Sequence, residues 1–205
     1  MFKNPKSLIA IAMTAALLIC AAVSAWSFCA RAGELRSEVL RLHVLANSDS
    51  PEDQALKLRV RDALLQAGGS FFDGTADIEN VREKLTENQA ALQEAGEAAI
   101  REGGRDYELL VFITEEYFAT RVYDGITLPA GRYTAVKAVI GQGCGQNWWC
   151  VMFPPLCLPA ARAEPEEYFD TSSLELIESD PKIEVRFKLV EWIEGLRERL
   201  SADSN

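Results

Sequence analysis

The N-terminal apolar segment constrains the fold of this chain more than any other feature of its sequence. Lys3 and Lys6 come first, and the residues from Ser7 to Ala30 then carry no charged side chain. A helix needs about 20 apolar residues to cross a bilayer, and a basic start followed by an apolar run is also typical of a secretory signal peptide. We therefore predict that residues 1–32 form a signal peptide or an uncleaved membrane anchor. A buried core helix is the alternative.

The position of this segment also predicts where the rest of the chain resides. Val23-Ser24-Ala25 and Ala30-Arg31-Ala32 both offer small residues for signal-peptidase cleavage. Positive charge ahead of the apolar run keeps the N-terminus in the cytoplasm, so everything after it should lie outside. We predict that residues 33–205 form one extracytoplasmic domain that is soluble and monomeric without the leader. The protein would be secreted or membrane-anchored, with the membrane touched only through the N-terminal segment.

The charge of the exported part argues against nucleic acid as a partner. After Ala32 it holds 18 Lys and Arg residues against 31 Asp and Glu residues, a formal charge near −13, because three of the 21 basic residues lie in the leader. A nucleic-acid-binding protein needs a basic face to neutralise phosphates. An exported domain also has no access to cytoplasmic coenzymes, so we predict no cofactor.

The first folded element is a strand followed by a turn. Residues 38–46 alternate between apolar and polar side chains, which indicates a half-buried strand. In the turn that follows, Ser50 is placed to cap the next helix, and we assign Asn47 and Asp49 turn and cap roles as well.

Helical periodicity follows the turn. Apolar residues at helical spacing predict a helix over residues 51–67, ended by Gly68-Gly69. A second helical region is expected over 77–102, with a break near Leu85 that would divide it into two helices.

The second half begins with strands. We expect strands over residues 108–114 and 119–123 around a turn at Glu115-Glu116, a turn at 128–131, and a strand over 133–140.

A last helix is expected to open at Asp180-Pro181, although an alternating strand over 183–189 is the alternative for its first half. The order β-α-α-β-β-β-α predicts a two-layer α+β domain with a mostly antiparallel sheet and helices on one face, preceded by the N-terminal signal or anchor helix.

The segment from Gly141 to Cys157 is the most unusual stretch of the exported part. It combines glycines with the adjacent Trp148 and Trp149, which cannot face the same core if the backbone is extended. Exposed Trp is a typical binding anchor, so we predict that Asn147, Trp148, Trp149 and Phe153 on this loop bind a protein partner. The alternative is that these rings cover an irregular core edge.

Three cysteines follow the leader, an odd number. Cys150 and Cys157 flank a Pro154-Pro155 bend and form a candidate disulfide in an extracytoplasmic protein. Buried reduced thiols are the alternative, and Cys144 has no assigned role.

The sequence offers little for catalysis. His43 is the only histidine and sits in the middle of a predicted strand, where a structural role is commoner than a catalytic one. The late cysteines do not have the close pairing typical of zinc sites, so we predict neither a catalytic set nor a metal site.

Several strings of residues resemble one family. The run from Leu42 to Lys57 (LHVLANSDSPEDQALK) resembles the opening motif of stage II sporulation protein R of endospore-forming bacteria. A further set of residues resembles the second half of that family's sequence. It comprises Tyr117-Phe118, Arg121, Tyr123, Leu128-Pro129-Ala130-Gly131-x-Tyr133 and the segment from Gly141 to Cys157. Two departures from the family pattern are Ala119, where proline is expected, and Cys144 inside the glycine-rich loop.

This resemblance implies a function that composition does not. Members of that family are secreted from the forespore into the space facing the mother cell. There they trigger the membrane-embedded aspartic protease that processes pro-sigma-E. The protein would be a ligand of the extracytoplasmic or membrane part of that protease, and not an enzyme. A thiol-dependent envelope or cell-wall enzyme and a structural spore-envelope protein are the alternatives.

Overall fold

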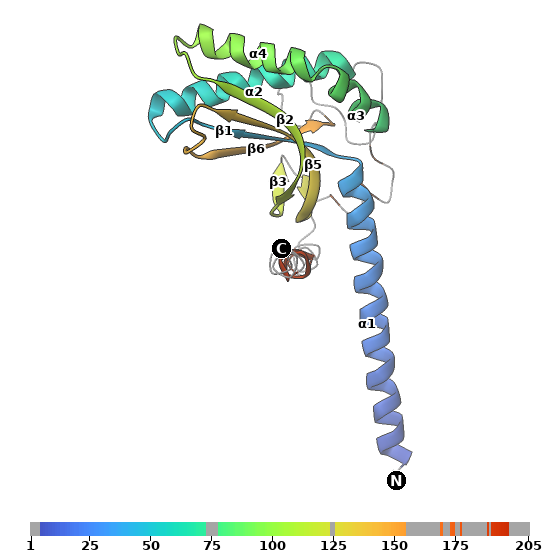
Figure 1. Cartoon of the computed structure of the whole chain (residues 1–205). Helices are drawn as coiled ribbons and strands as arrows, with labels where there is room; N and C mark the ends of the chain where they lie inside the picture. The colour runs from blue at the N-terminus through green and yellow to red at the C-terminus, as the bar shows by residue number, and fades with distance from the viewer. Residues whose placement is uncertain are drawn as a thin grey trace, which may run out of the picture.

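The computed structural model describes residues 5–72, 78–123 and 126–154, with residues 169, 173–174, 177, 188 and 190–196 near the C-terminus. Its elements, in chain order, are α1 (Pro5–Ser37), β1 (Leu40–Leu45), α2 (Pro51–Phe72), α3 (Ile78–Glu87), α4 (Gln89–Glu102), β2 (Leu109–Phe118), β3 (Arg121–Tyr123), β4 (Ile126–Leu128), β5 (Gly131–Ile140) and β6 (Asn147–Phe153). Figure 1 shows a folded domain from which α1 extends as a long separate helix. The predicted α+β class with an apolar N-terminal helix is confirmed.

One mixed sheet forms the base of the domain. Its strand order is β2-β5-β1-β6, and β3 pairs with β4 in a separate small ribbon. The β2–β5 and β1–β6 pairs are antiparallel, whereas the central β1–β5 pair is parallel. Because α2, α3, α4 and β2 all intervene between β1 and β5, the chain can return to β1 in the same direction. The sheet is therefore mostly antiparallel, as predicted, but its centre is a parallel pair and not a meander.

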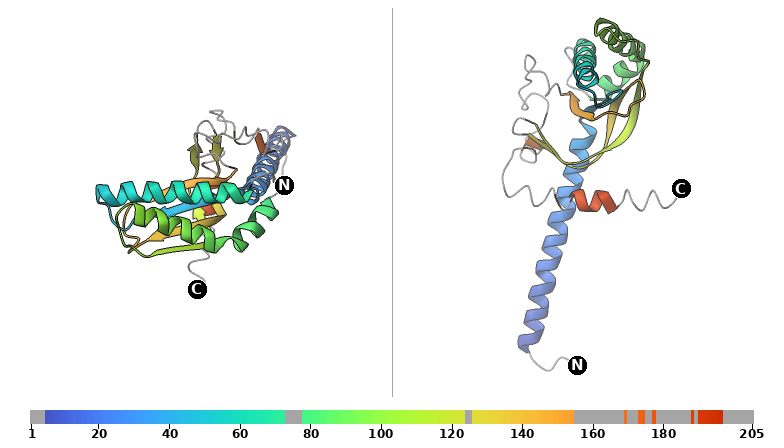
Figure 2. Two further views of the ribbon diagram at one scale, coloured as in Figure 1. Left: turned by 90° about the horizontal axis from the view of Figure 1, so that it is seen from above. Right: turned by 90° about the vertical axis from the view of Figure 1, so that its left-hand side faces the viewer.

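Three helices cover one face of this sheet. α2 and α4 run side by side over the strands, with α3 at one end (Figure 2). Together with inward-facing strand residues they bury a continuous apolar core, which includes Leu42, Val44, Leu64, Leu92 and Val136. This is the two-layer arrangement that the amphipathic stripes predicted.

Three predicted boundaries are wrong. α2 continues through Gly68 and Gly69 to Phe72, because Phe71 still packs on the core. β2 runs straight through Glu115 and Glu116, which were expected to form a turn.

The third wrong boundary concerns the glycine-rich segment, whose second half is strand β6 and not a loop. In each case tertiary contacts override a local breaker signal, which is a weak preference on its own. The predicted division of the second helical region is confirmed, and the two helices meet at Asn88.

A second, smaller core lies on the opposite face of the sheet. It joins the end of α1 to the β4–β5 region, through Phe28, Ala32 and Leu35 on one side and Leu128 and Tyr133 on the other. The segment assigned to the leader from sequence therefore contributes Phe28 and Ala32 to this packing.

Near the C-terminus, residues 190–196 are helical, and Val190 is buried in this second core. The expected start of that helix at Asp180 lies outside the described residues.

Candidate functional site

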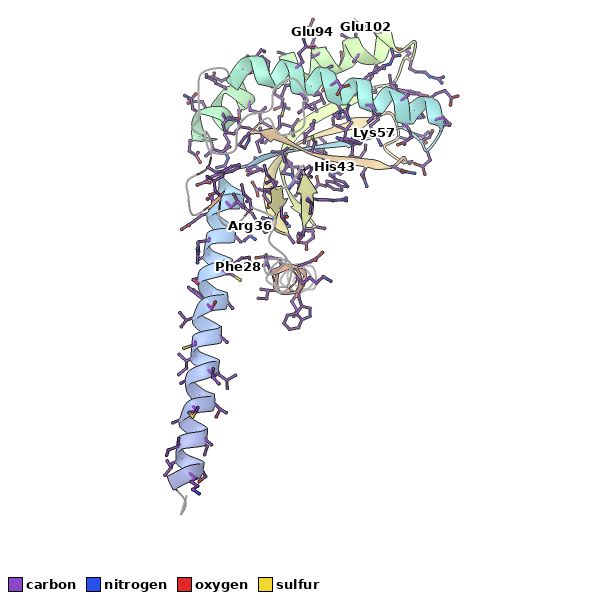
Figure 3. The ribbon with its side chains drawn as sticks, turned by 180° about the vertical axis from the view of Figure 1, so that it is seen from behind. Phe28, Arg36, His43, Lys57, Glu94 and Glu102 are labelled. Atoms are coloured by element: carbon purple, nitrogen blue, oxygen red, sulfur yellow. The ribbon has the colours of Figure 1, made fainter. Side chains whose placement is uncertain are left out.

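One rung of the sheet carries an unusual set of side chains on the face opposite α2 and α4. Phe112 of β2 lies opposite Lys137 of β5, Lys137 lies opposite His43 of β1, and His43 lies opposite Trp149 of β6. Leu42, next to His43, points into the helix-covered core, and successive strand residues alternate between faces. We name Phe112, Lys137, His43 and Trp149 the cross-sheet row. Figure 3 labels His43 on the sheet, away from the helices.

His43 is held on three sides and is only 3% exposed. Its Nδ1 lies 2.7 Å from Glu116 Oε2, and its Nε2 lies 2.9 Å from Asn147 Oδ1. Because a carboxylate can only accept, the Nδ1–H group donates to Glu116. The ring also stacks on Trp149, with 3.6 Å between centroids and 16° between planes. These contacts fix the imidazole in one orientation.

Glu116 joins His43 to Lys137. Its Oε1 accepts a hydrogen bond from Lys137 Nζ at 2.7 Å. Burial alone would raise the pKa of Glu116, but hydrogen bonds from Lys137 and His43 outweigh it and hold that pKa below the ordinary value of 4.5. The carboxylate is therefore ionised at neutral pH and pairs with the charge of Lys137.

A buried arginine supports the row from one side. Arg41, two residues before His43, is 0% exposed, and its guanidinium lies over the rings of Phe118, Tyr133 and Tyr123 at 4.3, 5.0 and 5.3 Å. Burial lowers the pKa of Arg41. Phe118 in turn packs edge-on against Trp149, 4.8 Å between centroids. Trp149 therefore packs between His43 and Phe118.

Beside the row lies an apolar area that the described residues leave partly open. The neighbouring rung pairs Leu110 with Val139, and Val139 with Leu45. Leu110 is 52% exposed and Phe112 is 39% exposed, whereas Leu45, Val139 and Trp149 are half-buried. We name these five residues the apolar face. Leu110 and Phe112 lie two residues apart on the edge strand, and exposed apolar side chains grouped in this way mark interaction sites.

The structure separates the four residues predicted to bind a partner. Asn147 is exposed and Trp149 half-buried, both next to His43. Trp148 lies on the opposite face, where it packs against the helix-covered core and under Arg61 at 4.6 Å. Phe153 is 3% exposed inside that core. The alternation of β6 puts the two half-buried tryptophans on different faces, Trp148 against the helix-covered core and Trp149 against the second core, so only Asn147 and Trp149 lie beside His43.

The residues with predicted turn and cap roles bind the glycine-rich loop as well as their own turn. Ser50 Oγ accepts from the Asp53 backbone N–H at 3.2 Å, as a cap does. Asn47 Oδ1 accepts from the Gln142 N–H at 3.0 Å, and Asp49 Oδ1 accepts from the Gln146 N–H at 2.7 Å.

Gly141 has a positive φ of 55° and an added side chain would collide with Asn47, so this position requires glycine. The two loops lie together at the end of β1 and the start of β6.

The cysteines are spread over the domain. Cys144 is a free, exposed thiol, and Cys150 is fully buried in β6. Cys157 lies outside the described residues, so its pairing with Cys150 stays a prediction.

The arrangement around His43 is better suited to holding side chains than to activating a nucleophile. Both ring nitrogens are engaged by oxygen atoms, and Cys150 points to the opposite face because it lies opposite Leu42 in register. Within the described ranges, no group of three His, Cys, Asp or Glu side chains could hold a metal ion. A rigid surface with exposed apolar side chains fits protein recognition.

Most residues of this site could not be predicted from the sequence. Locally, Glu115-Glu116 is typical of a turn, and Arg41 and His43 lie on the less apolar side of the alternating strand over residues 38–46. The missed signal is the alternation itself: Arg41 and His43 on β1 and Lys137 on β5 all fall on the same sheet face once the parallel pairing is known. That pairing is a long-range feature that no local pattern encodes.

Comparison with known proteins gives one consistent result. A family model described as stage II sporulation protein R matches residues 36–163. The curated Stage II sporulation protein R of Bacillus subtilis (strain 168) is 30% identical over 182 residues, covering 78% of this chain and 81% of that protein. No solved structure matches significantly. The match to the family model includes every residue of the cross-sheet row and of the apolar face.

Proposed function

The chain belongs to the stage II sporulation protein R family, and from that premise we propose that it is an exported sporulation signal. In this proposal it is secreted from the forespore and activates the membrane aspartic protease that processes pro-sigma-E in the mother cell. It acts as a ligand: it binds the active state of the protease better than the inactive state and so shifts the equilibrium between them.

This proposal rests on two features found in the same chain: the match to the family and an apolar N-terminal helix that precedes the matched residues. The match covers residues 36–163, a range that includes every helix and strand from β1 to β6. The helix before it is long and apolar enough to cross a membrane, with a mean hydropathy of 2.5 in its most apolar window. The basic residues ahead of this helix favour export of everything behind it. A domain presented outside the membrane can reach a receptor there but not cytoplasmic substrates.

The proposed receptor contact is the apolar face together with Asn147. Trp149 is already immobilised by His43 and Phe118, so little side-chain entropy remains to be lost when a partner covers it. Rigid aromatic side chains are typical anchors of protein interfaces. Leu110 and Phe112 supply further exposed apolar area on the same face. The partner surface should therefore be mainly apolar.

The test uses the full chain, produced in cells that carry only the protease and its pro-sigma-E substrate. Loss of the pro-sequence is followed by the change in electrophoretic mobility of the factor. The unaltered chain should trigger processing, and a chain lacking residues 5–25 should fail because it is not exported. If the shortened chain works from the cytoplasm, the proposal of an exported signal is wrong.

Two variants locate the contact. Trp149→Ala and Phe112→Ala should each leave the chain exported and folded but weaken signalling, because loss of a true anchor costs at least about 2 kcal/mol, roughly thirtyfold in affinity. Val122→Ala is the matched control: Val122 is 65% exposed on β3, outside the apolar face. If all three variants signal alike while folded, the receptor contact lies elsewhere.

The same assay separates a ligand from a thiol enzyme. Cys144→Ser removes the exposed thiol. An enzyme using this thiol as nucleophile would lose nearly all activity, whereas a ligand should signal normally.

A further inference from the structure

The length of the N-terminal apolar run predicts how deep Trp26 lies in a membrane. A helix rises 1.5 Å per residue, so about 20 residues cross the roughly 30 Å hydrocarbon core. The residues from Ser7 to Trp26 are a stretch of 20 with Lys6 directly before it. Trp26 is 79% exposed in α1. Tryptophan is enriched at the membrane–water interface, so α1 would place Lys6 at the inner boundary and Trp26 at the outer one.

The helix formed by residues 190–196 meets α1 on both sides of Trp26, from Ala21 to Cys29, and also reaches Arg36. Val190 and Ile193 line an apolar cavity of about 230 Å³ together with Ala25 and Phe28, the neighbours of Trp26 on α1. Glu194 also pairs with Arg36, 3.4 Å between Nη2 and Oε1. The right-hand view of Figure 2 shows this helix running crosswise to α1, just beyond the domain. A helix so placed lies along the membrane plane when α1 crosses it.

The side of this helix turned away from α1 is apolar at two exposed positions. Lys188, Trp192 and Leu196 are spaced four residues apart and share one face, with the exposed Glu191 at its border toward Lys188. Trp192 is 67% exposed and Leu196 is 40% exposed. An indole that is largely exposed to water is unfavourable on the surface of a soluble protein. A helix at the membrane interface instead buries such side chains at the headgroup boundary and extends lysine toward water.

We propose that residues 190–196 form a second membrane contact, in which Trp192 and Leu196 enter the outer interfacial layer of the bilayer beside Trp26. The contact depends on apolar insertion and not on charge, because the chain carries a net charge of −10 and anionic lipids would repel it. Its consequence is orientation. A single membrane helix can tilt by tens of degrees, about 0–40°, and a second contact beside it limits that tilt. The domain is then held with a defined face toward a neighbouring membrane protein.

The test reconstitutes the full chain, with α1 retained as verified by mass, into phosphatidylcholine vesicles brominated at shallow acyl positions. Bromine quenches only tryptophans that lie at its depth. Of the four tryptophans, only Trp26 and Trp192 should be quenched. Trp192→Phe should therefore remove roughly half of the quenchable emission, and Trp26→Phe a similar share. Trp148→Phe is the matched control, because Trp148 packs against the domain core and its loss should leave the quenchable emission unchanged.

Three outcomes would overturn the proposal. The first outcome is that Trp26→Phe lowers the quenchable emission but Trp192→Phe does not. This would show that the helix of residues 190–196 contacts α1 and not lipid. The second is the same result joined to a loss of pro-sigma-E processing in Trp192→Phe, which would assign Trp192 to a protein partner.

The third is quenching of Trp192 that appears only with anionic lipid and disappears in high salt, because charge would then drive the contact. Far-UV circular dichroism of each variant verifies that the fold is intact, and Leu196→Gln, which should weaken the quenching of Trp192 without removing any indole, provides a second reading of the same contact.

Discussion

Two glycines in neighbouring helices should respond to the same substitution in opposite ways. Gly69 lies in α2, where a Cβ atom would meet nothing within 4 Å. Gly96 lies in α4, where an added Cβ would collide with Leu109 Cδ2 and come within 3.5 Å of Leu64 Cδ2. Both residues are helical, so replacing either by alanine gains helix propensity, and only the surroundings differ.

The magnitudes follow from these surroundings. Gly69→Ala should stabilise the fold by about 0.5–1 kcal/mol, since alanine exceeds glycine by about that amount in a helix. Gly96→Ala has the same gain, but Leu109 is 1% exposed and must move within a packed core. Overpacking of this kind costs about 1–3 kcal/mol, so the net effect should be a loss of about 0–2.5 kcal/mol.

The assay is thermal unfolding of the full chain in mild detergent, followed by near-UV circular dichroism. For a chain of this size about 1 kcal/mol corresponds to a shift of roughly 2–4 °C in Tm. The Gly69→Ala melting point should rise by a few degrees and that of Gly96→Ala should stay level or fall. If Gly69→Ala lowers Tm, α2 does not continue through its two glycines. If Gly96→Ala raises Tm as much as Gly69→Ala, the close approach of α4 to β2 is wrong.

Three further predictions concern charge, edge protection and covalent structure. Because the pKa of Glu116 is lower in the folded state, its contribution is complete above the ordinary value of 4.5 and is lost as pH falls through the lowered pKa; Glu116→Gln should therefore reduce the loss of Tm below pH 4.5, and an unchanged profile would refute the pairing with His43 and Lys137. Gln93 Oε1 accepts from the Val111 N–H at 2.9 Å on the outer edge of β2, so Gln93→Ala should expose that edge and increase self-association measured by light scattering; unchanged scattering would show that Gln93 does not protect the edge. A disulfide between Cys150 and Cys157 should lower the mass of the exported protein by two hydrogens relative to its reduced form, and two free alkylated thiols at these positions would exclude it.

The elements that depend on local periodicity could be predicted from the sequence. The charge-free N-terminal run, the presence of strands β1 and β5, the cap at Ser50 and the break between α3 and α4 each follow from residues a few positions apart. The prediction that β1 is half-buried is wrong, because side chains on both faces of this central strand are buried. The α+β class follows from the order of the elements. The family motifs could also be recognised directly, because the run from Leu42 to Lys57 is continuous in the chain.

Tertiary structure alone decided which of these residues meet. The local sequence Glu115-Glu116 indicates a turn, yet Glu116 lies within β2. There it bonds Lys137 and His43, which belong to two other strands, β5 and β1. Likewise, Trp148 and Trp149 are equivalent in the sequence. Only the register of β6 against β1 sends one to the helix-covered core and leaves the other beside His43. Register and strand order arise from burial summed over the whole sheet, a global quantity that no window of the sequence contains.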